Sequence, residues 1–383
     1  MAGLACAHAL QGTGDVTLFE RAPRLGGHMH AVPTTDATGA AVDVEVGFLA
    51  FHRSRYPRLA ALLDAHGIET APSPTGLVVH DGIKDLVTPQ AAWLERADLR
   101  APLAALWARL LRHERHPDQH PYPNLPLAEV MAAEPALLHD VLVPSIAALW
   151  GFPTHEILAM SAAAVFESLG RFGREDEPFE RIVPSTAAWL ARLAAALPLR
   201  LVTGAHVTAV TPDGHVVVDG ESHAFDAVVI ATHADTARAL WQGPPSTALA
   251  AITYLPSVAI LHDTPGYARG APYTVHREPD GRLLVSWDMG LLQGAHGLVV
   301  TVGPPDFDLP NARARVVHGH PAMRPAALAA IPALEAHDEG PVYLAGSYFG
   351  RTGANEAAVA SGQRAAERVR RYLQDGSGNA NAR

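Results

Sequence analysis

The first twenty residues constrain the fold more than any other part of the chain. The small, apolar segment 2–11 predicts a helix. Val16–Phe19 is a short continuous apolar run that predicts a buried parallel strand, and Glu20 closes it. A helix, a strand and an acid in this order are typical of a dinucleotide-binding unit, where the acid binds a ribose hydroxyl. We therefore predict an α/β fold with a doubly wound, Rossmann-like sheet.

The glycine-rich turn that opens such a unit is represented only by its end. Gly3 stands 20 − 3 = 17 residues before Glu20, at the place of the third glycine of G-x-G-x-x-G. The first strand and the first two glycines would lie before Met1, so the first strand of the unit is truncated in this sequence. We therefore expect the open reading frame to extend upstream by roughly ten residues, enough for a strand of about 5–6 residues and a G-x-G.

Composition narrows the possible partners. The chain has 29 basic and 39 acidic residues, a formal charge of −10, which disfavours nucleic acid as a partner. Cys6 is the only cysteine, so an intramolecular disulfide is impossible and a cytoplasmic location is expected. No run of about 18 apolar residues predicts a transmembrane helix, which leaves only peripheral membrane contact open.

The remainder of the chain alternates between α/β segments and other material. Residues 76–200 are mostly helical by pattern, and 257–303 contain several short β-like segments that suggest an antiparallel sheet. Buried-strand runs return at Leu199–Val202, Ala227–Ala231 and Pro341–Ala345. We therefore predict a discontinuous binding domain with an inserted α+β substrate domain and a disordered tail. The ranges are 1–75, 199–240 and 340–373 for the binding domain, 76–198 and 241–339 for the substrate domain, and 374–383 for the tail.

The segment after the acid narrows the class of protein. ERAPRLGGHMH contains Glu20, Arg24, Gly26, Gly27 and His28 in that order. This order resembles the flavin amine oxidase and phytoene desaturase superfamily, which binds FAD. The resemblance implies that the glycine pair brings the backbone against the pyrophosphate and flavin, and that the arginine lies near the phosphates.

Further blocks follow in the family's order. Gly47 and Phe48 fit the block in which a glycine passes close to the flavin, and a bacterial group of predicted FAD/NAD(P)-binding amine-oxidase-like proteins reads similarly there. Val207 matches the strand whose backbone contacts the adenine side. Ala231 and Thr232 match the strand that returns to the FAD domain.

The last block resembles the family's C-terminal strand, glycine-rich turn and helix. Gly346 and Ser347 follow the strand, and Asn355 and Glu356 open the helix, whose N–H groups stabilise an anion. Many amine oxidases have an acid where Ser347 stands, and the bacterial group has His-Glu where this chain has Asn355-Glu356. These departures leave the roles of both positions in doubt.

The resemblance implies an FAD-dependent oxidoreductase that moves hydride from a small or lipophilic organic substrate to the flavin N5. An apolar stretch, Val141–Trp150, suits a lipophilic substrate. Trp287 and Tyr348 are candidates for the flavin environment, and no catalytic residue can be assigned. Two alternatives stay open: an NAD(P)-binding dehydrogenase, for which Glu20 would suit the ribose, and a degenerate FAD-fold protein without catalysis.

Histidines are the remaining signal, and we predict no metal site from them. His113, His116 and His120 follow one another closely, but Pro117 interrupts the helix that would align them. His318 and His320 form a second pair with no cysteine or carboxylate cluster nearby.

Overall fold

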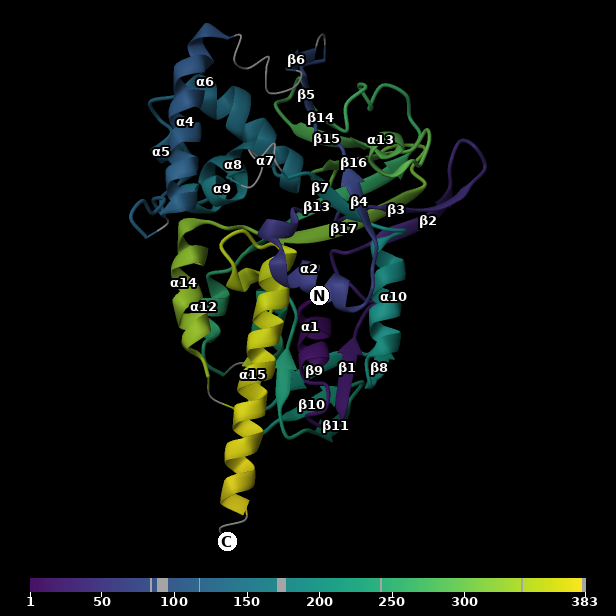
Figure 1. Cartoon of the computed structure of the whole chain (residues 1–383), viewed down its shortest axis with the longest axis vertical. Helices are drawn as coiled ribbons and strands as arrows, with labels where there is room; N and C mark the ends of the chain where they lie inside the picture. Colours follow the sequence, from purple (N-terminus) through teal and green to yellow (C-terminus); the bar gives the residue numbers. More distant parts are fainter. Residues whose placement is uncertain are drawn as a thin grey trace.

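The computed structural model describes residues 1–82, 85–87, 96–116, 118–170, 177–241, 243–338 and 340–380 of a mixed α/β protein. The strand Val16–Glu20 and the long C-terminal helix lie in the lower half of Figure 1, and a group of helices beside a large sheet fills the upper half. None of the helices in the described ranges is long and apolar enough to cross a membrane.

The four buried strands predicted from the sequence form two parallel pairs. β1 (Val16–Glu20) pairs with β8 (Leu199–Thr203). β12 (Val228–Ile230) pairs with β18 (Val342–Leu344). Within the described residues, these pairs form separate two-stranded sheets. The doubly wound, Rossmann-like sheet therefore stays a prediction.

Two alanine-rich helices cross beside these strands. They are α1 (Ala2–Ala9) and α15 (Asn355–Ala380). A Cβ on Gly362 of α15 would overlap the carbonyl oxygen of Ala2, so the two backbones are in direct contact. Cys6 is buried there, and burial raises the pKa of its thiol to about 12, as for a core side chain. α15 extends to Ala380, into the range 374–383 that was predicted as a disordered tail.

A three-stranded antiparallel sheet follows β8 along the chain, in the order β11 (Glu221–Ala224), β10 (His215–Val218), β9 (Val207–Val210). Its apolar side chains share a core with three helices, α11 (Ala234–Leu240), α12 (Ser246–Ala250) and α14 (Pro325–Ala336). By packing, α12 and α14 therefore belong with the parallel strands, although both lie in the ranges predicted for the substrate domain.

The largest sheet has seven strands. Their order is β17 (Ala314–Pro321), β13 (Tyr254–His262), β16 (Val299–Gly303), β15 (Leu283–Asp288), β14 (Tyr273–Arg277), β5 (Leu77–His80), β6 (Asp85–Val87). The antiparallel sheet predicted within 257–303 corresponds to β13, β16, β15 and β14, which pair antiparallel. β5 joins them in parallel from a region that was predicted mostly helical, because four residues are too few to show a clear strand period.

Helices cover one face of this sheet (Figure 1). They are α4 (Ala97–Arg115), α5 (Leu127–Val130), α6 (Pro135–Leu137), the π-helical turn η2 (Leu138–Leu142), α7 (Val143–Trp150), α8 (Thr154–Ala159) and α9 (Ala162–Leu169). α4 buries Leu99, Leu103, Leu106 and Leu110, which lie on one face at helical spacing. The apolar stretch Val141–Trp150 lies mostly in this core.

The remaining elements are short, apart from α2 and α10. They are β2 (Ala31–Thr35), β3 (Ala41–Glu45), η1 (Arg53–Arg55), α2 (Pro57–Ala65), β4 (Thr70–Ser73), β7 (Phe179–Ile182), α10 (Thr186–Ala196), α13 (Met289–Gln293) and η3 (Ser347–Phe349). Trp189 and Leu190 of α10 pack in one core with Leu59 and Leu63 of α2. α10 therefore also packs with the N-terminal segments, although it falls in the predicted substrate range 76–198.

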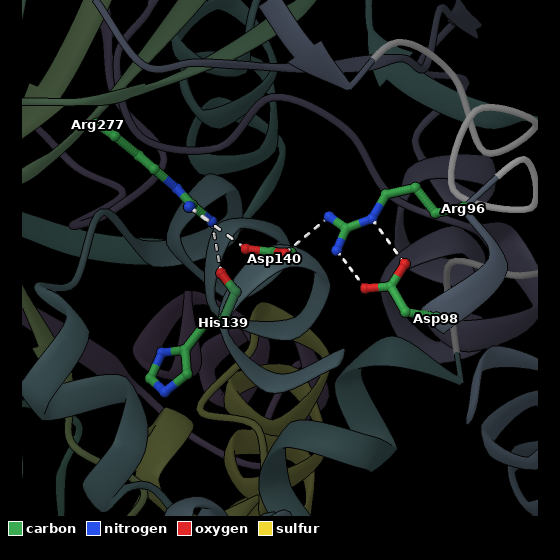
Figure 2. Close-up of polar contacts among 5 residues, drawn as sticks. All are labelled: Arg96, Asp98, His139, Asp140 and Arg277. Carbon is green, nitrogen blue, oxygen red and sulfur yellow. Dashed lines mark hydrogen bonds and ion pairs between the residues drawn. The ribbon is translucent and has the colours of Figure 1, made fainter. Parts of the chain in front are cut away.

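An ionic network links α4, η2 and β14 (Figure 2). Asp140 accepts hydrogen bonds from Arg96, at 2.7 Å, and from Arg277, at 3.5 Å. Arg96 also binds Asp98, at 2.6 Å, and Arg277 donates to the carbonyl oxygen of His139, at 2.5 Å. The network ties the helical layer to the end of β14, an inner strand of the sheet.

Replacing Asp140 with Ala is expected to lower the free energy of unfolding by about 1 kcal/mol, because two guanidinium groups lose a shared acceptor in a partly solvated place. Urea unfolding at low salt measures the loss, which should shrink in 1 M NaCl. Asp280→Ala is the control, since Asp280 pairs with Arg282 within one turn. An equal loss in both variants would contradict the bridging role.

Candidate cofactor site

The loop after β1, from Arg24 to His28, is called the cofactor loop, and it contains two glycines with positive φ. Gly26 has a φ of +108°, and a Cβ there would overlap the Cδ1 of Leu190 and come within 2.5 Å of the carbonyl oxygen of Met29. Gly27 has a φ of +60°, but a Cβ there would meet nothing within 4 Å. Only glycine adopts both conformations without strain. The loop is therefore closely packed behind Gly26 and open in front of Gly27.

Arg24 and Glu20 hold the ends of this loop. Arg24 donates to the carbonyl oxygens of Gly27, at 3.0 Å, and Leu25, at 3.3 Å, so its guanidinium folds back over the loop. One carboxylate oxygen of Glu20 accepts from the N–H of Ala22, at 2.8 Å. Glu20 thus lies at the carboxyl end of β1, where a parallel sheet binds a ribose.

Gly47 touches this loop from the end of the β2–β3 hairpin. A Cβ on Gly47 would overlap the carbonyl oxygen of His28 and lie 3.1 Å from Cε1 of His318. Phe48 points into an aromatic group instead, stacked on Phe51 at a centroid distance of 6.1 Å. The backbone of Gly47 therefore packs directly against the loop that contains Gly26 and Gly27. The side chain of Phe48 instead packs against Phe51.

The other predicted segments meet at the carboxyl ends of β12 and β18. A Cβ on Gly3 would lie 3.5 Å from the Cβ of Ala231, and one on Gly346 would lie 3.1 Å from the carbonyl oxygen of Thr232. Ser361 holds Gly346 in place by hydrogen bonds of 3.0 Å to its N–H and its carbonyl oxygen. Segments more than 100 residues apart thus converge near the start of α1.

Four predicted residues lie less clearly in this group. Val207 begins β9, and Ser347 begins η3 as a half-buried side chain. Asn355 is the first residue of α15. The two carboxylate oxygens of Glu356 accept from the N–H groups of Arg58 and Leu59, both at 3.1 Å, so this side chain caps α2. Binding of the cofactor by these four residues, as by the other predicted site residues, stays a prediction.

Tyr348 lies beside Gly346 and is fully buried. Within the described residues its hydroxyl has no hydrogen-bond partner, and burial raises its pKa. A buried hydroxyl without a partner costs about 1–3 kcal/mol, so a ligand group that binds it would be stabilised. Both aromatic candidates lie in hydrophobic cores: Tyr348 packs with α11, α12 and α14, and Trp287 packs between the large sheet and the helices. The Nε1 of Trp287 is also buried without a partner among the described residues.

Three histidines, His28, His318 and His320, meet at the junction of the loop and the large sheet, and their positions in the sequence did not predict this contact. Nε2 of His28 lies 3.3 Å from Nε2 of His320 on β17. His318, also on β17, lies with its ring centroid 4.5 Å from that of His28. The only available signal was the i, i+2 spacing of His318 and His320, which places both on one face of a strand. In the described part of the chain, no group of three or more His, Cys, Asp or Glu side chains is arranged to hold a metal ion.

Glu45 precedes Gly47 and is 2% exposed. Its carboxylate accepts from the N–H and hydroxyl of Thr186 at the start of α10, at 2.6 and 2.7 Å. Burial nevertheless raises the pKa of Glu45 to about 7, above its ordinary value of 4.5. In the folded protein the carboxyl group of Glu45 is therefore mostly protonated below about pH 7.

This shift predicts a pH-dependent stability. The contribution of Glu45 is fully present below pH 4.5 and is lost as the pH rises through 7, a change of about 3 kcal/mol. Glu45→Gln should remove this slope, so that the variant gains on the wild type between pH 4.5 and 8 in denaturant unfolding. Glu69→Gln, at an exposed site, is the control. A constant difference between wild type and Glu45→Gln across this range would refute the expectation.

Comparison with known proteins defines the class. The model of the family described as flavin containing amine oxidoreductase matches residues 1–307. The chain belongs to this family, and it is an FAD-dependent oxidoreductase. The resemblance seen in the sequence and the FAD prediction are confirmed, and the NAD(P)-binding alternative is not favoured. A search of curated proteins found no match.

Solved structures of the same fold include enzymes with different substrates. A CLA-producing fatty acid isomerase from P. acnes is 14% identical with a TM-score of 0.75, over 96% of both chains. Cyclohexylamine oxidase from Brevibacterium oxydans IH-35A is 17% identical with a TM-score of 0.70, over 97% of both chains. Wild-type putrescine oxidase bound to putrescine is 16% identical with a TM-score of 0.66, over 96% of both chains. At these identities the similarity establishes the fold alone.

Proposed function

We propose that this enzyme transfers hydride from a small, lipophilic organic substrate to the N5 atom of bound FAD. One observation carries the proposal: several glycines come together near Glu20 at the end of β1. At Gly27 the backbone faces open space, whereas at Gly3, Gly26, Gly47 and Gly346 it is packed against other protein atoms. Such a constellation suits a dinucleotide, because glycine allows the backbone to approach a pyrophosphate.

The residues present fit FAD. Gly27 leaves open space for a phosphate, the start of α1 offers N–H groups to its charge, and Glu20 has a carboxylate placed for a ribose hydroxyl. Tyr348, beside Gly346, has a buried hydroxyl without a hydrogen-bond partner among the described residues. Bound FAD supplies the two-electron acceptor, and the protein binds, orients and excludes water.

A lipophilic substrate is favoured over a charged one by the character of the inserted domain. α7 and its neighbours form a large apolar core against the sheet, and Ala148, Leu149 and Trp150 are only partly buried in it. The fatty acid isomerase of the same fold is a precedent for a lipophilic substrate. A cytoplasmic location completes the proposal.

The test is the absorption spectrum of the protein purified from its full open reading frame. Flavin bands, and FAD released in about one equivalent on denaturation, would support the proposal. A colourless protein whose fluorescence is quenched by NADH would favour the dehydrogenase alternative. A colourless protein that responds to neither cofactor would favour a degenerate fold.

A further inference from the structure

The edge strand of the large sheet meets the cofactor loop through imidazole rings. His318 and His320 project from the same face of β17 because they are two residues apart. His320 reaches Nε2 of His28 at 3.3 Å, across 292 residues of chain. Pro321, the next residue, packs against Gly353 of the turn before α15. The His28–His320 pair thus lies where the Gly26–His28 loop, Gly47 and the C-terminal turn come together.

The contact between two ring nitrogens determines how many protons the pair holds. A neutral imidazole has one N–H and one bare nitrogen, so at 3.3 Å one Nε2 must donate and the other must accept. His318 differs, because its Nε2 faces the carbonyl oxygen of Val46 at 3.0 Å and must donate there. His28 and His320 can therefore exchange a proton with each other, whereas His318 is held in one tautomer.

The surroundings keep the pair neutral. The groups that face it are His318, His233 and the amino group of Met1, with Arg24 and His30 behind them. The acids near these groups are Glu20, beside Met1 and Arg24, and Asp235, beside His233. Burial, followed by the neighbouring imidazoles, lowers the pKa of His320 to about 3 and that of His28 well below its usual value. A new negative charge nearby would raise both.

We propose that His28 and His320 act as one proton-holding pair in the reaction. Oxidation of the substrate breaks a C–H bond and an adjacent X–H bond, where X is nitrogen or carbon. The electron pair of the C–H bond leaves with its hydrogen as hydride, and the electron pair of the X–H bond forms the new double bond. The proton of the X–H bond goes to the bare Nδ1 of the ring whose Nε2 donates within the pair, and the two rings then hold three N–H protons and one positive charge. This proposal rests on the proposed function, which supplies the hydride acceptor.

The first experiment needs no substrate. The slope of the midpoint potential of the FAD-loaded protein against pH counts the protons taken up with two electrons. We expect this count to be larger by about one in the wild type than in His320→Gln, because Gln keeps a hydrogen-bonding group but cannot hold the proton. His155→Gln changes an exposed histidine elsewhere and should match the wild type. Equal counts in wild type and His320→Gln would overturn the proposal.

The second experiment uses the unmodified protein, so that a folding defect in the variant cannot obscure the result. Nitrogen-15 NMR of the histidine rings, recorded on oxidised and reduced FAD-loaded protein, follows the protonation of His28 and His320 directly. We expect both rings to change together on reduction and to titrate as a coupled pair. Rings that stay neutral on reduction would overturn the proposal while the flavin spectrum still upholds the proposed function. A protein without flavin would overturn both.

Discussion

Gly26→Ala is expected to lower the free energy of unfolding by about 3–5 kcal/mol. The φ of +108° at Gly26 lies outside the conformations that alanine adopts readily, and the added methyl group would overlap a buried methyl of Leu190. It would also approach the backbone oxygen of Met29, which cannot rotate away as a side chain can. Thermal and urea unfolding measure the loss.

Gly27→Ala is the matched control at the next position. Its φ of +60° lies in the left-handed region, which costs alanine about 1–2 kcal/mol, and the methyl group would meet no protein atom within 4 Å. We therefore expect a small loss of stability but a loss of FAD affinity of about tenfold or more, because the methyl group enters the space assigned to the phosphate. Similar stability losses in both variants would contradict the packed and open faces of the loop. Unchanged FAD affinity in Gly27→Ala would contradict the placement of the phosphate.

Gly362→Ala is expected to destabilise the protein by about 2–4 kcal/mol, although alanine is the better helix former by about 1 kcal/mol. The new Cβ would overlap the carbonyl oxygen of Ala2 and lie 3.1 Å from the nitrogen of Cys6. Both atoms belong to the backbone of α1, so the two helices would have to separate. Because α1 begins beside Ala231, the separation should also reduce FAD content.

Glu367→Ala is the control for this variant. Glu367 lies on the exposed side of the same helix, so its replacement should change the free energy of unfolding by no more than about 0.5 kcal/mol. Chemical denaturation of both variants at one pH provides the comparison. A Gly362→Ala protein as stable as the wild type would show that α1 and α15 do not pack as closely as described.

Local patterns in the sequence predicted several elements well. The apolar runs Val16–Phe19, Ala227–Ala231 and Pro341–Ala345 correspond to β1, β12 and β18. The antiparallel segments within 257–303 correspond to β13 to β16. In these cases a continuous run of apolar residues, or an alternation of apolar and polar residues, predicts the strand directly. The order of Glu20, Arg24, Gly26 and Gly27 predicted the family for the same reason, since one short segment contains them all.

Other features depended on which distant segments meet. β5 joins the large sheet beside β14, about 200 residues away, and α10 packs with α2 instead of with the helical layer. Neither partner is encoded in a local period, because a strand or a helix shows which face it buries but not against what.

The N-terminal segment illustrates both cases. The sequence by itself determined that a helix, a strand and Glu20 follow one another, that a glycine loop comes next, and that the chain belongs to an FAD-binding class. Only the tertiary structure decided that His28 of this loop meets His320 of the sheet, since 292 residues separate them. The physical reason is that local sequence specifies conformation and burial, whereas contacts between titratable groups arise from the packing of complete elements.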